Sequence, residues 1–98
     1  MEPITDLSAV VSSKSQVSAD LAGEVVILSI EKGVYYGLNE VAARIWSLIQ
    51  EPKRVADISE IILSEYEVEH EKCRHDIKDL LHLLHNEGLI EVMDEMPS

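Results

Sequence analysis

The stretch that most constrains the fold of this chain is residues 33–39, Gly-Val-Tyr-Tyr-Gly-Leu-Asn, which predict a strand running directly into a helix. Its side chains alternate with the period of two expected of a strand with one buried face. Asn39 is a suitable N-cap for a helix beginning at Glu40, so a single residue sets the angle between sheet and helices. Gly33 and Gly37 add little side-chain cover, which leaves the strand backbone accessible to another extended chain.

Two further strands are predicted before this stretch. Alternation of apolar residues from Val17 to Leu21 predicts the first, and a tight turn at 22–24 leads into the second. The second is a nearly continuous apolar run over 24–31, rich in β-branched residues, which is typical of a central strand covered on both faces. Residues 31–33 then turn the chain again. The prediction is a three-stranded antiparallel meander with residues 34–38 at one edge.

Three amphipathic helices are predicted after the sheet. Apolar residues recur at helical spacing over about 39–51, from Val55 to Tyr66, and over about 70–87. Pro52 ends the first helix, and Gly88 is a suitable residue just past the end of the third. The fold class is therefore α+β, in a winged helix-turn-helix-like arrangement in which a three-stranded antiparallel sheet precedes three helices.

Length and composition favour one domain, since a chain of 98 residues has room for a single small core. We assign residues 17–93 to this domain, with a last short extended piece at 89–92. Residues 1–16 are mixed and polar, and only Ala9-Val10-Val11 is apolar enough to pair with something, so a flexible N-terminal arm is expected there. Residues 94–98 are expected to form a disordered tail.

The charge of the chain limits its partners. Eight Lys and Arg against 19 Asp and Glu give a formal charge of −11, which repels nucleic acid and anionic lipid and favours basic or neutral partners. A single cysteine cannot form an internal disulfide, which suits a reducing compartment. The first residues lack the pattern of a signal peptide, and no apolar run is long enough to span a membrane. We therefore expect a cytoplasmic protein that binds neither nucleic acid nor membrane.

No pattern in the chain indicates catalysis or a cofactor. The third predicted helix carries four histidines near Cys73, namely His70, His75, His82 and His85. Cys73 and His75 point in nearly opposite directions on this helix, so they cannot both coordinate one metal ion. An apolar helix face gives Cys73 no evident base, so a small buried thiol is expected rather than a nucleophile. Trp46 is expected in the core or a subunit contact. We predict no catalytic residue, no metal and no cofactor.

The residue types instead favour a peptide-binding site. An extended peptide that pairs along Val34–Leu38 gains several backbone hydrogen bonds whatever its amino-acid sequence. Selectivity for particular peptides must therefore come from side-chain pockets. The flank of the third helix with Cys73, Leu80 and Leu83 is suited to form such pockets, and Asp76 to hold a Lys or Arg of the peptide. One ring of the Tyr35-Tyr36 pair should pack inward and the other should be exposed.

Residues 33–46, Gly-Val-Tyr-Tyr-Gly-Leu-Asn-Glu-Val-Ala-Ala-Arg-Ile-Trp, together with the preceding strand over 24–31, resemble the PqqD family, and within it the stand-alone RiPP recognition elements of lasso-peptide biosynthesis. The resemblance covers roughly residues 17–92. It implies a non-catalytic protein that binds the N-terminal leader of a precursor peptide as an added strand between the third strand and the third helix. It also implies partners, namely a cysteine protease that removes the leader and, indirectly, an ATP-dependent synthetase that closes the macrolactam ring. By position, the site would comprise Val34, Tyr35, Tyr36, Gly37, Leu38, Cys73, Asp76, Ile77, Leu80 and Leu83.

The chain departs from the usual family pattern at two helix starts. Arg54 stands where a capping residue is expected, and Glu69-His70 stands where Asp-Pro commonly opens the third helix. Two other functions stay open at this point. One is a PqqD-like protein of another peptide or cofactor pathway, such as one with a radical enzyme, and the other is an acidic winged-helix interaction module.

Overall fold

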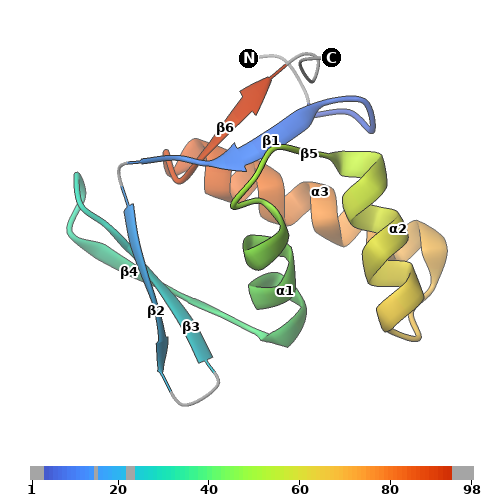
Figure 1. Ribbon diagram of the computed structural model, residues 1–98, viewed down its shortest axis with the longest axis horizontal. Helices are drawn as coiled ribbons and strands as arrows, with labels where there is room; N and C mark the ends of the chain where they lie inside the picture. The colour runs from blue at the N-terminus through green and yellow to red at the C-terminus, as the bar shows by residue number, and fades with distance from the viewer. Residues whose placement is uncertain (1–3, 15, 22–23, 94–98) are drawn as a thin grey trace.

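The computed structural model describes residues 4–14, 16–21 and 24–93, and it contains two small antiparallel sheets and three helices (Figure 1). The expected disorder of residues 94–98 concerns residues outside these ranges, as does most of the predicted turn at 22–24. One sheet has the strand order β2-β3-β4, and the other has the order β5-β1-β6.

The β2-β3-β4 sheet is the predicted meander. It consists of β2 (Gln16–Leu21), β3 (Glu24–Ser29) and β4 (Val34–Leu38), all antiparallel. The turn into β4 closes with the Gly33 N–H donating to the Ser29 carbonyl at 2.8 Å, and Gly33 has a φ of +66°, a backbone conformation that favours glycine. The expectation that β3 is covered on both faces is wrong, because Ile27 is fully buried while Val26 and Leu28 on the opposite face are partly exposed.

The second sheet was not predicted. Its central strand, β1 (Ala9–Ser12), lies between β5 (Lys53–Arg54) and β6 (Ile90–Met93). Ala9 and Val10 are completely buried. The expected flexible arm over 1–16 is therefore wrong for residues 9–12, since three apolar residues suffice for a strand when both of its edges find partners far along the chain.

The N-terminal segment also completes the start of α2 (Val55–Glu65). Arg54 makes no side-chain cap, as its residue type predicts. The first two helical N–H groups instead donate to the chain before β1, from Val55 to the Ser8 carbonyl and from Ala56 to the Asp6 carbonyl, each at 3.0 Å. Backbone carbonyls that lie at least 47 positions earlier in the sequence thus replace the missing capping side chain of α2.

The other two helices follow their predictions closely. In α1 (Glu40–Leu48), the Asn39 side chain caps the helix by accepting from the Ala42 N–H at 2.8 Å. This helix ends three residues before the predicted boundary, because the Ile49 carbonyl accepts from the Ser12 N–H of β1 at 2.8 Å. The third helix, α3 (His70–Asn86), ends before Gly88, whose φ is +74°.

The core lies where the three helices meet the inner face of the β2-β3-β4 sheet and the β5-β1-β6 sheet. Its fully buried side chains come from both sheets and from every helix, and Trp46 is buried in it as predicted. Within the described part of the chain, no helix is long and apolar enough to cross a membrane. The completely buried hydrophobic residues are Ala9, Val10, Ile27, Ile49, Val55, Ile58, Leu81 and Leu89.

The predicted α+β class, with a three-stranded antiparallel sheet followed by three helices, is confirmed. The winged helix-turn-helix description fits only loosely, since the central strand of the second sheet precedes the meander and the outer strands of that sheet come from the helical half of the chain.

Candidate functional site

One edge of the β2-β3-β4 sheet is open. Among the described residues, β4 pairs with β3 alone, so its other edge presents unpaired backbone groups. The side chains of this strand alternate as predicted: Tyr36 and Leu38 pack against the core, whereas Tyr35 is 71% exposed on the opposite face beside Gly37. Neither Lys nor Pro, which commonly protect strand edges, occurs in β4. The edge is suited to pairing with another extended chain.

A polar cluster ties one end of β4 to the end of α3. The Glu87 carboxylate accepts from the Tyr36 hydroxyl at 2.6 Å and from the Lys32 ammonium at 2.8 Å. Bonding to Lys32 and then to Tyr36 lowers the pKa of Glu87, while the bond to Glu87 raises the pKa of both partners. These contacts fix the position of β4 relative to the last turn of α3.

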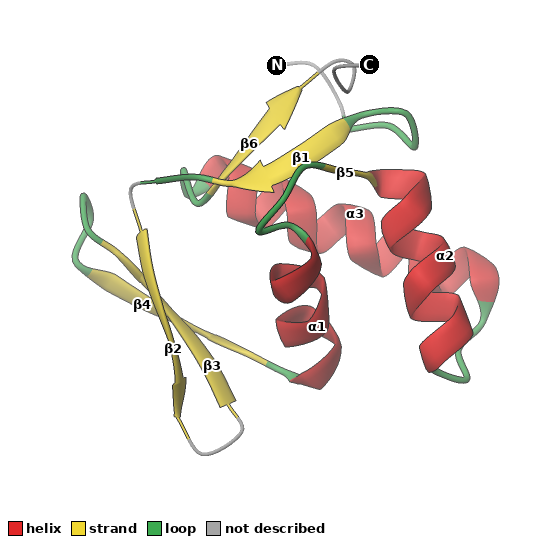
Figure 2. Cartoon of the chain, viewed as in Figure 1, coloured by secondary structure: helices red, strands yellow, loops and turns green. Residues whose placement is uncertain are grey.

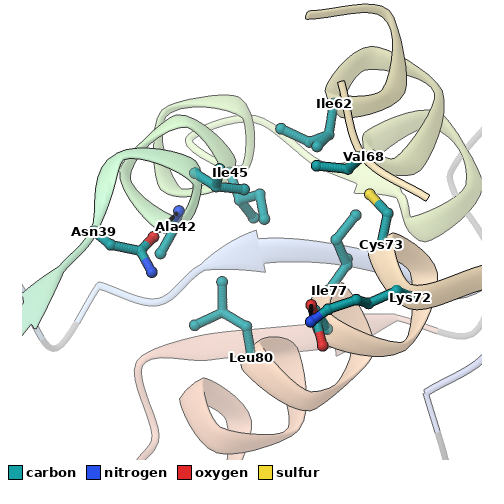
Figure 3. A pocket seen from close by; sticks show the side chains of 11 residues that line it. Asn39, Ala42, Ile45, Ile62, Val68, Lys72, Cys73, Ile77 and Leu80 are labelled. Atoms are coloured by element: carbon teal, nitrogen blue, oxygen red, sulfur yellow. Dashed lines mark hydrogen bonds and ion pairs between the residues drawn. The ribbon is translucent and has the colours of Figure 1, made fainter. Parts of the chain in front are cut away.

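A pocket of about 300 Å³ lies at the other end of β4, between α1 and the first half of α3 (Figure 3). Figure 3 shows Ala42 and Ile45 of α1 facing Ile77 and Leu80 of α3 across the space, with Val68 closing one side. The lining is largely apolar. It is formed by Asn39, Val41, Ala42, Ile45, Ile62, Val68, Lys72, Cys73, Asp76, Ile77 and Leu80.

The polar side chains at this pocket include a buried thiol and an exposed ion pair. Cys73 is buried, and burial followed by the nearby Asp76 charge raises the pKa of its thiol, so it is protonated and unreactive at neutral pH. Asp76 and Lys72 form an exposed i,i+4 ion pair with 3.9 Å between Oδ2 and Nζ. Such a pair is weak and exchanges easily with a charged group from a ligand.

The structure brings four of the predicted site residues together: Cys73, Asp76, Ile77 and Leu80 all line the pocket. Leu83 lies further along α3, is 51% exposed and does not line it. The five predicted residues of β4, 34–38, do not line it either, although Asn39, which follows them directly, does. The predicted set therefore divides into an open strand edge, a helical pocket next to the end of that strand, and Leu83.

Several pocket residues were missed by the sequence reasoning. Val41, Ala42 and Ile45 fall within the helix predicted over about 39–51 but were not assigned to the site, and Val68 lies in the loop between α2 and α3. The signal for α1 was present, because a helix that begins directly after an edge strand must place its first turn beside the end of that strand. Ile62 and Val68 gave no comparable signal, since their position depends on how α2 packs against α3.

Two histidines of α3 make contacts that the structure defines. The Nε2 atom of His82 accepts from the Ile4 N–H at 3.3 Å, while its Nδ1 atom lies 2.9 Å from the Lys78 carbonyl. His75 lies 3.2 Å from Asp79 on the surface. Over the described ranges, no three His, Cys, Asp or Glu side chains are grouped as ligands for a metal ion.

A comparison with protein families matches residues 24–90 to the model described as Coenzyme PQQ synthesis protein D (PqqD). The chain belongs to the PqqD family. The matched range runs from the start of β3 to the start of β6, so it contains the strand edge and the pocket described above. The resemblance drawn from residues 33–46 is confirmed.

Two solved structures are similar to this PqqD-family chain. One is described as TbiB1 in complex with the TbiA(beta) leader peptide; it is 41% identical, and the match covers 83% of this chain and 94% of that one with a TM-score of 0.76. The other is described as lasso peptide synthetase B1 complexed with the leader peptide, with 28% identity, coverage of 84% and 96%, and a TM-score of 0.75. No curated protein sequence matches.

Proposed function

We propose that this protein binds the N-terminal leader of a ribosomally made lasso-peptide precursor as an added strand on β4. The observation that carries the proposal is the open edge of β4 next to an apolar pocket. Both similar structures are complexes with leader peptides. Each backbone hydrogen bond along the added strand contributes roughly 0.5–1.5 kcal/mol. Four or five such bonds give appreciable affinity even after the peptide has been ordered.

Selectivity comes from the helical side of the site. The pocket formed with Cys73, Ile77 and Leu80 has the size and lining for one or two apolar side chains of the leader. Asp76 exchanges its ion pair with Lys72 for a Lys or Arg of the peptide. Leu83, exposed further along α3 than the pocket, offers the peptide an additional apolar contact on the side of the Glu87 cluster. The residues proposed to contact the peptide are Val34, Tyr35, Tyr36, Gly37, Leu38, Cys73, Asp76, Ile77, Leu80 and Leu83.

The protein acts as a carrier and not as an enzyme in this proposal. It holds the leader while a cysteine protease removes it, and it supplies the precursor indirectly to the ATP-dependent synthetase that closes the macrolactam ring, all in the cytoplasm. The protonated Cys73 thiol supports a non-catalytic role. A second candidate is recognition of a precursor from another cofactor or peptide pathway, which the match to the PQQ-synthesis model favours.

Calorimetry with the precursor peptide encoded beside this protein tests the proposal. The full precursor and its isolated leader should bind with equal affinity, and the leader-less core should not bind. A precursor of the PQQ type, offered in the same experiment, separates the two candidate pathways. Binding of the core alone, or no binding of either leader, would contradict the proposal.

A pair of leucine variants tests the helical side of the site. Leu83→Lys places a charge on the exposed flank of α3 and should weaken leader binding roughly tenfold, because an apolar contact of the size of a leucine side chain contributes about 1.5–3 kcal/mol when buried. Leu7→Lys makes the same change at a side chain that is also exposed but lies in the loop before β1. It should leave binding unchanged. Equal affinities for both variants would remove Leu83 from the site.

A further inference from the structure

Asn39, the cap of α1, carries a second polar group at the pocket between α1 and α3. Its Oδ1 atom accepts from the Ala42 N–H at 2.8 Å, and this bond fixes the orientation of the whole side-chain amide. Because a backbone N–H can only donate, the atom that faces Ala42 is the oxygen, and the Nδ2 amine lies on the other side. Figure 3 shows this amine turned away from Ala42, toward Leu80 of α3. Asn39 therefore presents two N–H donors to the pocket that it lines.

The amine of Asn39 is available to a ligand. Across residues 4–14, 16–21 and 24–93, the structure gives Nδ2 no hydrogen-bond partner, and the residue is exposed. Two other side chains of the pocket lining can donate. Lys72 is already paired with Asp76, and the thiol of Cys73 is a weak donor. Asn39 is thus a neutral donor that a bound group can engage without breaking an ion pair.

The residue type at position 39 favours a role beyond capping. Asp and Ser cap helices about as well as Asn does. A carboxylate has no donor, however, and a serine hydroxyl is shorter and carries a single hydrogen. Asn alone combines an acceptor directed at the helix with an NH₂ group directed away from it. Capping α1 therefore does not require Asn39, whereas recognition of an acceptor at the pocket does.

The acceptor comes from the main chain of a guest strand. Figure 2 shows β4 passing directly into α1, so a peptide on the open edge that continues past Leu38 finds no further strand N–H groups. Its next carbonyl oxygen has no backbone partner in the strand. The pocket beside this point is lined largely by apolar side chains, which suits an apolar side chain of the guest. The group that remains to meet the Asn39 amine is a main-chain carbonyl.

We infer that Asn39 is a peptide-binding residue whose Nδ2 amine donates to a main-chain carbonyl of the bound leader where the guest strand passes the end of β4. This inference rests on the proposed function. The bond adds one side-chain donor to the row of backbone donors on the open edge of β4. It also holds the peptide backbone at the mouth of the pocket, so that the neighbouring apolar side chain enters it.

Three substitutions at position 39 separate capping from binding. Asn39→Asp has the same shape as the wild type and Asn39→Ser is neutral, and both keep an acceptor for the Ala42 N–H while removing the amine. Asn39→Ala removes the cap as well. Asn86→Ser, at the exposed last residue of α3, is the matched control because Asn86 does not line the pocket. Thermal melting measures the stability of each variant, and calorimetry with the isolated leader measures its affinity.

Asn39→Asp and Asn39→Ser should melt close to the wild-type temperature and bind leader about threefold to tenfold more weakly, the loss expected for one net hydrogen bond. Asn39→Ala should lower both quantities, and Asn86→Ser should lower neither. Wild-type affinity in both Asn39→Asp and Asn39→Ser would overturn the inference and leave Asn39 as a cap only. Failure of the wild type to bind leader would instead contradict the proposed function.

Nuclear magnetic resonance of the side-chain amides gives a readout that is independent of stability. The chain has two asparagines, so the Asn39 NH₂ signals are those missing from the Asn39→Asp spectrum, and the Asn86 signals serve as an internal control. Saturation with leader should shift the Asn39 signals and slow their exchange with water, while the Asn86 signals stay in place. Unshifted Asn39 signals in the saturated complex would overturn the inference even if the variants bind more weakly.

Leader peptides with single alanine substitutions identify the source of the acceptor. If the acceptor is a main-chain carbonyl, the ratio of the wild-type affinity to the Asn39→Ser affinity should be the same for every alanine-substituted leader. One substituted leader for which this ratio falls to one would reveal a side-chain acceptor and overturn the main-chain assignment.

Discussion

The two sheets of this protein contrast in how their strands are covered. In the β5-β1-β6 sheet, the central strand β1 is paired on both sides, and Ala9 and Val10 are completely buried. In the β2-β3-β4 sheet, the middle strand β3 is likewise paired on both sides, but only its Ile27 and Ser29 are buried, and one face of the sheet is exposed. The first sheet connects distant parts of the chain, whereas the second presents edges and an apolar face to the surroundings.

This contrast shows how a small protein separates stability from binding. Strand pairing in β5-β1-β6 involves residues about 45 and 80 positions apart, and it also supplies the backbone acceptors that start α2. The β2-β3-β4 sheet is built from neighbouring segments and needs no pairing beyond its own hairpins. Because the core does not depend on the free edge of β4, that edge is available for a guest strand.

The largest effect is expected from removing β1. Deletion of residues 1–12 exposes the edges of β5 and β6 and removes the acceptors for the first N–H groups of α2, so the truncated protein should be unfolded by circular dichroism and by loss of a cooperative thermal transition. A cooperative transition in the truncated protein would show that the sheet around β1 is dispensable.

Truncation of one valine in each sheet makes the comparison between the two sheets quantitative. Val10→Ala, in the completely buried centre of β1, should lower the free energy of unfolding by about 2 kcal/mol. Val17→Ala, at an exposed position of β2, should change it by no more than roughly 0.5 kcal/mol. Urea titrations of both variants measure the difference, and equal effects would contradict the division between the two sheets.

A pair of proline substitutions tests the open edge of β4. Consecutive N–H groups in a strand point to opposite sides, so of Tyr35 and Tyr36 one donates toward β3 and the other toward the open edge. Tyr35→Pro and Tyr36→Pro should therefore differ: one variant loses stability, and the other folds but binds leader roughly tenfold to a hundredfold more weakly. Thermal melting and calorimetry on both variants separate the outcomes. Full leader affinity in both folded variants would exclude strand addition at β4.

Hydrogen exchange compares the strands without any mutation. Amides of β1 should exchange only through global unfolding, whereas those on the outer edges of β2 and β4 should exchange faster. Addition of leader should slow exchange in β4 and leave β2 unaffected. Protection of β2 instead would move the guest strand to the opposite edge of the sheet.

The smallest expected effect concerns pH. The pKa of Glu87 is lowered from its ordinary value of 4.5, so its bonds to Lys32 and Tyr36 stabilise the fold above that value, and this contribution is lost as the pH falls through the lower pKa of the folded state. The stability difference between the wild type and Glu87→Gln should therefore shrink below about pH 4 in urea titrations. A difference that is constant down to pH 2 would show that the Glu87 carboxylate is not responsible.

The parts of this fold that were predictable from sequence are those with local causes. The strand at residues 34–38 has a period of two, Asn39 is a cap, and Gly88 follows a helix end, so β4, the start of α1 and the end of α3 were found where they occur. β1 and β5 have no such signature. Lys53-Arg54 is a strand only because Ala9 and Val10 pair with it, and no local pattern records that pairing.

The candidate site follows the same rule. Two pocket side chains of α3, Cys73 and Leu80, were predictable because they share one helix flank, which sequence spacing alone reveals, whereas Ile77 was assigned to the site only through the family resemblance. Leu83 belongs to the same flank in sequence but lies beyond the pocket. The contributions of Ile62 and Val68 depend on the packing of α2 against α3, and that packing depends on contacts between segments far apart in the chain.

The pairing of Ala9 with Met93 places the entry and the exit of the described fold next to each other, and Figure 1 shows β1 and β6 together at one end of the molecule while β4 lies elsewhere. A catalytic domain fused through a short linker before β1 or after β6 would thus leave the margin of β4 unobstructed. The same architecture is compatible with a free-standing peptide-binding protein and with a covalently tethered module of a larger one.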